Sequence, residues 1–336
     1  MDSSAVLLVA LESDLHADSV VYRLSEKGVR VVRVDPTVDH CLPANVHIET
    51  GTGTRAVYEF PSGETLSSAD ITGVLCRFAI DGLTPSDANP LAYFSRSEEL
   101  AAFLAPLRML DSSLWINDPW VEARADCRIL QAQQAIAAGL SVPPCIVSSD
   151  YSKLLEFHAA HNHDCIIKPI SNAALAKVSG EFVHAHELTT ENFSAPYAVE
   201  FRPLPSGHRD SVDTTPSLLQ ERVHKKFDIR ATVVDNSVFS AAMRVRSGAP
   251  VDFRRETNFR AEPFPLPPAI QASLVTLVAS LGLRYASCDL TVDENDEIRF
   301  LESNVSGNWL WTELDAALPI SAAIAAALIQ TQGRPC

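Results

Sequence analysis

The sequence lacks the features that mark several specialised classes of protein. Its seven cysteines stand singly, without a C-x-x-C pair, so we expect neither a disulfide framework nor a zinc site. It also lacks a block of lysine or arginine, and its net charge is −15. A negative field of this size repels the phosphates of nucleic acids, so we expect no nucleic-acid partner.

Long apolar runs and glycine-rich motifs are missing as well. The N-terminal apolar stretch AVLLVAL covers residues 5–11, whereas a membrane span needs about 20 apolar residues. Acidic residues flank this stretch in place of the basic start of a signal peptide, so we predict a cytoplasmic protein with no membrane contact. The following turn, LESDLHAD, has no glycine fingerprint for a dinucleotide, and the chain has neither a P-loop nor a G-x-S-x-G motif.

The length and composition are those of a globular protein with more than one domain. The chain has 336 residues, 46% of them hydrophobic and 21% charged, which fits two or three domains. Its start predicts an apolar strand at 5–11, a helix at 14–27 that ends at Gly28, and an alternating strand at 29–35. A further strand at 71–78 extends the same layer. This order indicates an N-terminal α/β domain.

A second domain is expected to begin near residue 117, where Asn117 or Asp118 caps a helix whose first turn holds Pro119. The later predicted elements are strands at 165–171, 217–223, 228–234 and 238–245, a helix at 269–282, a hairpin at 288–304 and a closing helix at 318–330. We therefore expect three domains, at 1–116, 117–216 and 217–336.

The predicted hairpin carries three oxygen donors. Glu302 and Asn304 are two residues apart, so in a strand their side chains point to the same face. If the turn is the four residues ENDE, residue 293 pairs with residue 298 and Asp289 faces Glu302. Two carboxylates and an amide, without imidazole or thiolate, suit Mg²⁺. The alternative is an exposed acidic hairpin on an acidic protein, and the spacing alone does not decide between the two.

Positive side chains lie where a phosphate clamp would need them. Lys168 ends the apolar strand CIIKPIS, and a lysine there must reach solvent or an anion, because burying it alone is costly. Arg230, Arg244 and Arg254 add positive charge between residues 228 and 254. One arginine guanidinium can bind two phosphate oxygens at once, which suits such a clamp. Each of these residues alone also fits an ordinary surface position.

The order of the segments IIKP, LLQERV, DIRATVV, DFR, CDL and FLESN resembles that of the ATP-grasp ligases. In that family, two α+β lobes hold ATP between antiparallel sheets. The segments INDP, LQAQQAIAAGLSVP, KKFDIRATVV and FLESNVSGNWLWTE resemble the peptide-modifying members of the microviridin or graspetide type, and the likeness includes GVLCRF in the N-terminal part. The resemblance implies an α+β ATP-grasp fold, preceded by an α/β pre-ATP-grasp domain, that uses ATP and Mg²⁺.

The resemblance assigns roles by position. The residues expected to bind the nucleotide are Arg128, Lys168, Gln220, Glu221, Val223, Asp228 and Arg230. The expected catalytic cations at the phosphates are Arg244 and Arg254. The expected magnesium ligands are Asp289, Glu302 and Asn304.

Within this set, the resemblance brings Lys168 to the α and β phosphates and Asp228 near the ribose. The segment from Gln220 to Val223 would form the hinge along the adenine edge. Arg128 stands where the family usually has the lysine of a K-x-x-Q motif, and Asn308 stands in place of a usual glutamine. The family has a proline at position 305 and a glycine-rich stretch after Lys168, which this chain lacks. These departures concern the substrate more than ATP binding.

The implied activity is that of an ATP-dependent carboxylate ligase that works through an acyl phosphate. The implied substrate is a ribosomal precursor peptide with a leader, whose acidic side chains become linked to Ser, Thr or Lys as esters or amides. Two alternatives stay open: a ligase that joins a small carboxylate, such as an amino acid or peptide, to an amine, and a non-catalytic ATP-grasp scaffold. The resemblance also suggests a homodimer.

Overall fold

The computed structural model describes residues 4–38, 41–50, 54–78, 90–168, 170, 199–200, 216–243 and 260–329. The strands of this part of the chain form four sheets, one of five strands, two of four and one of three. None of its helices combines the length and the apolar character that crossing a bilayer requires.

The N-terminal domain is built on a parallel sheet in the order β2-β1-β6-β7. Its strands are β1 (Ala5–Val9), β2 (Val31–Val34), β6 (Ile71–Cys76) and β7 (Trp115–Ile116). β1 is buried at every position because helices or strands cover both faces of the sheet, which is why the segment is continuously apolar. The predicted strand at 71–78 thus pairs with β1 as expected.

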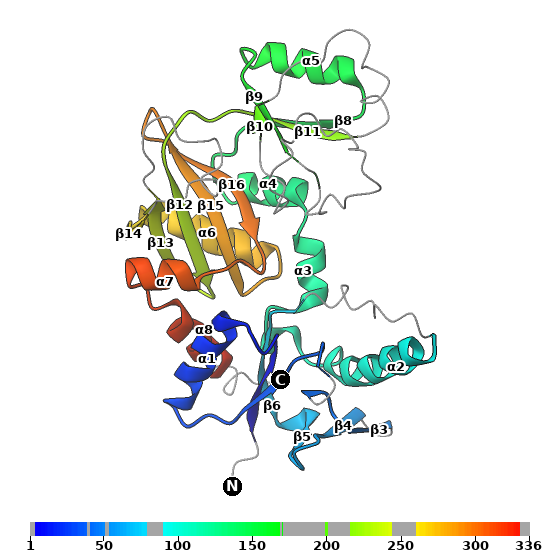
Figure 1. Cartoon of the computed structure of the whole chain (residues 1–336). Coiled ribbons are helices and arrows are strands. Elements are labelled where there is room, and N and C mark those ends of the chain that lie inside the picture. Colours follow the sequence, from blue (N-terminus) through cyan, green and yellow to red (C-terminus); the bar gives the residue numbers. More distant parts are fainter. Residues whose placement is uncertain are drawn as a thin grey trace.

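One face of this sheet packs against helices from both ends of the chain, α1 (Leu15–Ser25) and α8 (Ile320–Ile329). The sequence places α8 in the predicted domain at 217–336. In the structure, the apolar side chains of α8 pack into the core of the N-terminal domain. Gly73 on β6 allows this contact, because a Cβ atom there would lie 2.5 Å from the Leu328 carbonyl oxygen. Figure 1 shows α8 beside α1, next to the parallel sheet.

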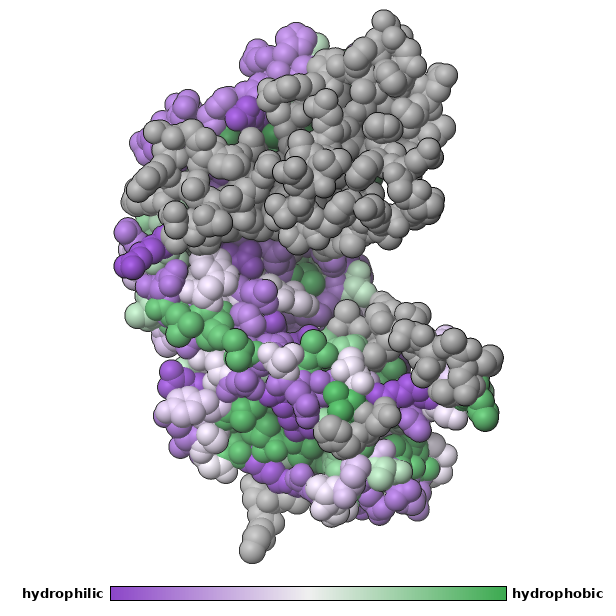
Figure 2. Space-filling model, viewed as in Figure 1, coloured by the Kyte–Doolittle hydropathy of each residue, from purple (hydrophilic) through white to green (hydrophobic). Residues whose placement is uncertain are grey.

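The other face packs against α2 (Pro90–Leu107) and a small antiparallel sheet that the sequence analysis did not predict. This sheet contains β3 (Asn45–Thr50), β4 (Thr54–Glu59) and β5 (Thr65–Ser67), followed by the short 3₁₀ helix η2 (Ser68–Asp70). A second 3₁₀ helix, η4 (Ser112–Leu114), leads into β7. On the face shown in Figure 2, hydrophobic and hydrophilic residues alternate in patches over this lower part of the molecule. Exposed apolar residues scattered in this way are ordinary for a protein surface.

The central lobe is an antiparallel sheet in the order β10-β9-β11-β8, with α5 (Tyr151–Ala160) on one face. Its strands are β8 (Cys145–Ser148), β9 (Cys165–Lys168), β10 (Val199–Glu200) and β11 (Ser217–Glu221). In Figure 1, α5 covers the outer face, and the other face is turned toward the five-stranded sheet. The expected domain boundary at 216/217 falls before β11, which pairs with β8 and β9, so the chain leaves this sheet only after Glu221.

The C-terminal lobe holds the five-stranded antiparallel sheet, in the order β14-β13-β12-β15-β16. Its strands are β12 (Lys225–Val234), β13 (Ser237–Met243), β14 (Ala261–Pro263), β15 (Tyr285–Asp293) and β16 (Ile298–Asn304). The apolar face packs against α6 (Pro268–Ser280) and α4 (Arg128–Ala137). Two short helices, α3 (Pro119–Ala125) and α7 (Leu310–Ala316), flank the sheet. Asp118 caps α3, as predicted.

The hairpin of β15 and β16 has a different register from the predicted one near its turn. Val292, not Asp293, pairs with Ile298. A β-bulge then shifts the ladder by one residue, and Asp289 pairs with Glu302. The predicted opposition of these two carboxylates is confirmed, but the extra residue in the bulge produces it, rather than a turn of four residues.

Candidate functional site

One face of the five-stranded sheet is polar and the other is apolar. On β12, Phe227 and Ile229 face the apolar core, whereas Asp228 and Arg230 alternate with them and face the other way. The register places Asp289 of β15 opposite Arg230, on this polar face. All these side chains are buried, so each polar group requires a partner.

The three predicted metal ligands lie together on this polar face. Asp289 is opposite Glu302, and the Asn304 side chain donates a hydrogen bond from Nδ2 to Asp289 Oδ2 at 3.0 Å. Among the described residues, no three His, Cys, Asp or Glu side chains are grouped so that they could hold a metal, so a cation bound by Asp289 and Glu302 would need the Asn304 amide as its third protein donor. Its Oδ1 is the atom that a cation would take. A set of oxygen donors only fits Mg²⁺ in preference to a transition metal.

Arg230 lies against this set. Its Nη1 donates to Asp289 Oδ1 at 2.6 Å, and its Nη2 lies 3.4 Å from the Asn308 carbonyl oxygen. Burial alone lowers the pKa of Arg230, but the Asp289 carboxylate outweighs this effect and raises it above the ordinary value. Arg230 therefore pairs with Asp289 and orients it, so the structure places this guanidinium against a predicted metal ligand.

The loop after β16 closes over Arg230. A Cβ atom on Gly307 would lie 2.6 Å from the Ser287 Cβ and 2.8 Å from Arg230 Nη2, so glycine is required for this close approach. The Tyr285 hydroxyl donates to the Gly307 carbonyl oxygen at 2.6 Å. The loop is thereby held against the strand that carries Asp289.

Arg128 belongs to the site from the outer side of β16. It lies on the first turn of α4, and its Nη2 is 3.4 Å from Glu302 Oε2. Both side chains are largely buried. The sequence resemblance placed Arg128 with the nucleotide, and the structure places its guanidinium beside a predicted metal ligand.

Lys168 and the hinge belong to the central sheet. Lys168 pairs with Leu218, and Gln220 pairs with Cys145, which puts Lys168 and Gln220 on the face opposite to α5. Lys168 is close enough to Cys145 to lower the pKa of that thiol, although burial raises it more. Gln220 and Glu221 end β11, and Val223 lies in the short connection that leads to the five-stranded sheet. This connection, where the hinge is predicted, joins the two lobes.

Asp228 begins the C-terminal side of the hinge. Burial raises its pKa, and the Lys225 ammonium, which donates to Oδ2, offsets this only in part. Its other oxygen, Oδ1, is buried and makes no hydrogen bond to the described residues, although the Thr291 side chain lies near enough to the carboxyl group to oppose the rise in its pKa. An unpaired carboxylate oxygen fits a ligand hydroxyl, such as that of a ribose. The predicted catalytic residues Arg244 and Arg254 lie outside the described residues.

The structure adds a group of side chains from the N-terminal half that the sequence analysis did not select. Asn117 donates from Nδ2 to the carbonyl oxygens of Tyr285 and Val305, at 2.8 and 3.1 Å. The Ser306 hydroxyl donates to Glu122 at 2.8 Å. Burial raises the pKa of Glu122 to about 7. These contacts hold the start of β15 and the end of β16 together.

Arg77 and His16 hold the far end of the same loop. Arg77 donates to Asn308 Oδ1 at 3.0 Å and to Asp14 at 2.7 Å, and its guanidinium lies 4.7 Å from the centre of a Trp309 ring. The backbone N–H groups of Trp309 and Leu310 donate to His16 Nδ1. Burial lowers the pKa of His16 to about 4, so the ring is neutral and accepts these bonds. Arg77 and Asn117 lie in GVLCRF and INDP, two segments of the resemblance.

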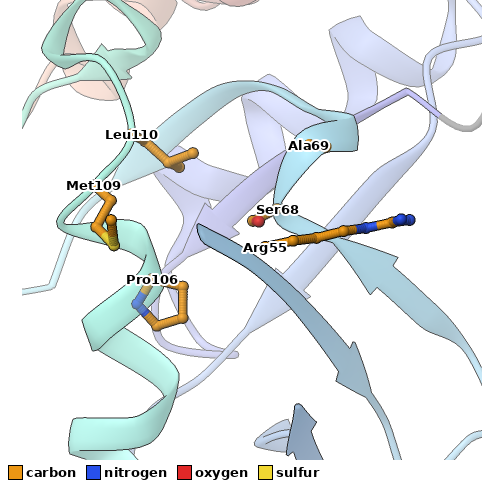
Figure 3. A pocket seen from close by; sticks show the side chains of 6 residues that line it. All are labelled: Arg55, Ser68, Ala69, Pro106, Met109 and Leu110. Carbon is orange, nitrogen blue, oxygen red and sulfur yellow. The ribbon is translucent and has the colours of Figure 1, made fainter. Parts of the chain in front are cut away.

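A cavity of about 300 Å³ lies elsewhere, in the N-terminal domain. It is lined by Arg55, Ser68, Ala69, Pro106, Met109 and Leu110, between β4 and the end of α2 (Figure 3). Arg55 extends away from Pro106 and Met109 in this view. None of the predicted site residues lines this cavity.

Comparison with known proteins shows the fold. No family model and no curated protein matches the sequence. A RiPP-associated ATP-grasp ligase of Chryseobacterium gregarium, solved with ADP and a leader and core peptide, matches with a TM-score of 0.81 at 20% identity, over 99% of this chain and 98% of that one.

Two further solved structures match over almost the whole chain. The macrocyclase MdnB of Microcystis aeruginosa has a TM-score of 0.72 at 23% identity, over 97% of this chain and 99% of its own. The ATP-grasp ligase PsnB, in complex with a minimal precursor, has a TM-score of 0.72 at 20% identity, over 98% and 99%. The predicted α+β ATP-grasp fold with a preceding α/β domain is therefore confirmed.

Proposed function

We propose that this protein is an ATP-dependent carboxylate ligase that matures a ribosomal precursor peptide by forming side-chain ester or amide links. The observation that carries the proposal is the meeting of Asp289, Glu302 and Asn304 on one polar sheet face, with Arg230 paired to Asp289 at 2.6 Å. This set lies in a fold shared, over nearly the full length of each chain, with the macrocyclase MdnB and with two ATP-grasp ligases that were solved with a leader and core peptide or a minimal precursor.

The proposed reaction has two steps. A substrate carboxylate oxygen attacks the γ-phosphorus of ATP, the bond to the β-phosphate oxygen breaks, and ADP leaves. A hydroxyl or amine then attacks the carbonyl carbon of the acyl phosphate and loses its proton as inorganic phosphate departs. The product has lost one water for each link formed, and neither step needs an enzyme nucleophile, since positioning and charge stabilisation carry both.

The residues of the chain have separate roles in this proposal. Lys168 binds the nucleotide phosphates, and the buried Asp228 oxygen accepts from the ribose. Asp289, Glu302 and Asn304 would hold Mg²⁺, which would supply positive charge to the phosphates. Arg230 orients Asp289 through the hydrogen bond at 2.6 Å. Arg244 and Arg254 are proposed as the cations that stabilise the transferring phosphoryl group.

The test is mass spectrometry of a peptide reaction. The purified protein, ATP and Mg²⁺ are mixed with peptides that have a leader and an acidic core rich in Ser, Thr and Lys, encoded next to its gene. We expect products lighter by whole waters and one ADP per link. Lys168→Met and Glu302→Gln should abolish both, whereas the exposed Glu98→Gln should not.

Other outcomes would refute the proposal. ADP formation stimulated by free amino acids, with the peptide unchanged, would show a small-molecule ligase instead. Nucleotide binding without ADP formation, with all these acceptors present, would show a scaffold. The homodimer suggested by the resemblance is a separate proposal, which light scattering of the purified protein tests.

A further inference from the structure

At Ser303 the outer edge of β16 is completed by a side chain, whereas nearer the turn the Phe300 N–H donates to the Ser141 carbonyl oxygen at 2.8 Å. β16 is the last strand of its sheet, so the backbone groups of every second residue point outward. At Ser303, which lies between Glu302 and Asn304, the outward N–H donates to Gln131 Oε1 at 2.9 Å. The outward carbonyl oxygen of Ser303 accepts from Gln131 Nε2 at 2.8 Å. The Gln131 amide thus makes both bonds that a neighbouring strand residue would make.

The Gln131 amide makes three hydrogen bonds, two from Nε2 and one to Oε1. Besides Ser303, its Nε2 donates to the carbonyl oxygen of Ala125, the last residue of α3, at 2.9 Å. Gln131 is 2% exposed and Ser303 is 3% exposed. A buried amide with all of these bonds is rigid, and removing it leaves the two Ser303 backbone groups unpaired in the interior.

The contact between Gln131 and Ser303 lies just beyond the β-bulge, in the part of β16 whose register the bulge changes. Up to Leu290 and Phe300, the hairpin follows one register, and beyond the bulge Asp289 pairs with Glu302 and Ser287 with Asn304. Without the extra residue in β16, the register of Leu290 and Phe300 would continue, and Asp289 would pair with Leu301 instead of Glu302. A shift of one residue turns every side chain of a strand to the other face, so Glu302 and Asn304 would leave Asp289 and face the apolar core.

We propose that Gln131 is a positioning residue that holds β16 in its bulged register and thereby sets Glu302 and Asn304 beside Asp289. Arg128, three residues earlier on α4, reaches Glu302 itself, so one helix face contacts both the backbone and a side chain of the ligand strand. The inference rests on the proposed function for the role of the ligands, but the clamp on Ser303 is independent of it.

Two measurements test the proposal, and both compare Gln131→Met with Gln133→Met, the same change at an exposed position of the same helix. The first is Mn²⁺ binding in the presence of ADP, followed by the electron paramagnetic resonance signal of free Mn²⁺. We expect Gln131→Met to weaken Mn²⁺ binding at least about tenfold, as removal of a group that supports a metal ligand does. Gln133→Met should bind as the wild type does.

The second measurement is hydrogen exchange of the Ser303 amide without metal or nucleotide. We expect faster exchange in Gln131→Met and unchanged exchange in Gln133→Met. If Gln131→Met does not fold, Gln131→Asn replaces it, because its amide is one methylene too short to keep all three bonds and should show the same losses.

The outcomes separate the two proposals. Wild-type Mn²⁺ affinity and Ser303 exchange in a folded Gln131 variant would overturn the positioning role, as would equal losses in Gln133→Met. If the wild type binds no Mn²⁺ with ADP, while Ser303 exchange still accelerates in Gln131→Met, the proposed metal site is wrong and the clamp on β16 stands.

Discussion

Glu122 should make the stability of this protein fall as the pH rises through neutrality. Its carboxylate lies at the junction of α3 with the loop after β16, where Asn117 donates to Oε1 at 3.1 Å and Ser306 to Oε2 at 2.8 Å. Burial raises its pKa to about 7, and these bonds and Arg77 offset the burial only partly. The perturbation that tests this is Glu122→Gln, which keeps the shape and cannot ionise.

The sign follows from proton binding in the two states. Between the ordinary pKa of 4.5 and the folded-state value of about 7, the folded protein keeps a proton that the unfolded chain has lost. The free energy of unfolding therefore decreases with rising pH in this window, and the loss is complete above it. Below pH 4.5 both states are protonated, and Glu122 has no effect.

The magnitude follows from the two pKa values. Their difference corresponds to about 3 kcal/mol, at 1.36 kcal/mol for each pKa unit, and this is an upper limit. Glu122 is only partly buried, so water at the junction reduces the effect, and we expect roughly 1–2 kcal/mol. Glu122→Gln should thus equal the wild type near pH 4.5 and exceed its stability by this amount at pH 8.

The assay is urea unfolding at a series of pH values between 4.5 and 8. Subtracting the wild-type curve from that of Glu122→Gln removes the contributions of all other groups. Glu98→Gln, on the exposed face of α2, removes the same charge and should show no such difference. Parallel curves for Glu122→Gln and the wild type would refute the reasoning, and so would a variant that loses stability at pH 8.

Two further predictions concern the polar sheet face. Asp289→Asn removes the charged partner of the buried Arg230. It should lower the free energy of unfolding by about 3–5 kcal/mol, measured by urea titration without metal. A loss below about 1 kcal/mol would contradict the buried ion pair. Gly307→Ala places a Cβ atom 2.6 Å from the Ser287 Cβ. It should lower the free energy of unfolding by about 1–3 kcal/mol in the same titration. An unchanged free energy of unfolding would show that the loop is not closed over Arg230.

Much of the site was predictable from spacing along the chain. The alternation of a strand places Glu302 and Asn304 on one face, and a hairpin brings Asp289 opposite Glu302. Lys168 and the segment that includes Gln220 and Glu221 followed from short apolar strands and from the family resemblance. Asp289, Glu302 and Asn304 lie within 15 residues of one another, so local geometry is sufficient to place these three.

The means by which the carboxylates meet was not predictable. The sequence analysis explained the opposition of Asp289 and Glu302 by a turn of four residues, whereas a bulge produces it. The contact that holds Ser303 comes from Gln131, 172 residues earlier in the chain, so the residues of the hairpin alone do not contain it. In our proposal, this tertiary contact holds the register.

By itself, the sequence determined the apolar and polar faces of the strands, the oxygen-only donor set and the order of elements that indicates the ATP-grasp fold. The tertiary structure alone decided that α8 completes the N-terminal core, and that Arg230 turns to Asp289. It also decided that Asn117 donates hydrogen bonds to the carbonyl oxygens of Tyr285 and Val305, which are 168 and 188 residues away in the chain. The physical reason is the distance along the chain over which each feature is determined. The direction of a strand side chain depends on its near neighbours in the sequence, whereas a buried hydrogen bond depends on which distant elements the hydrophobic core brings into contact.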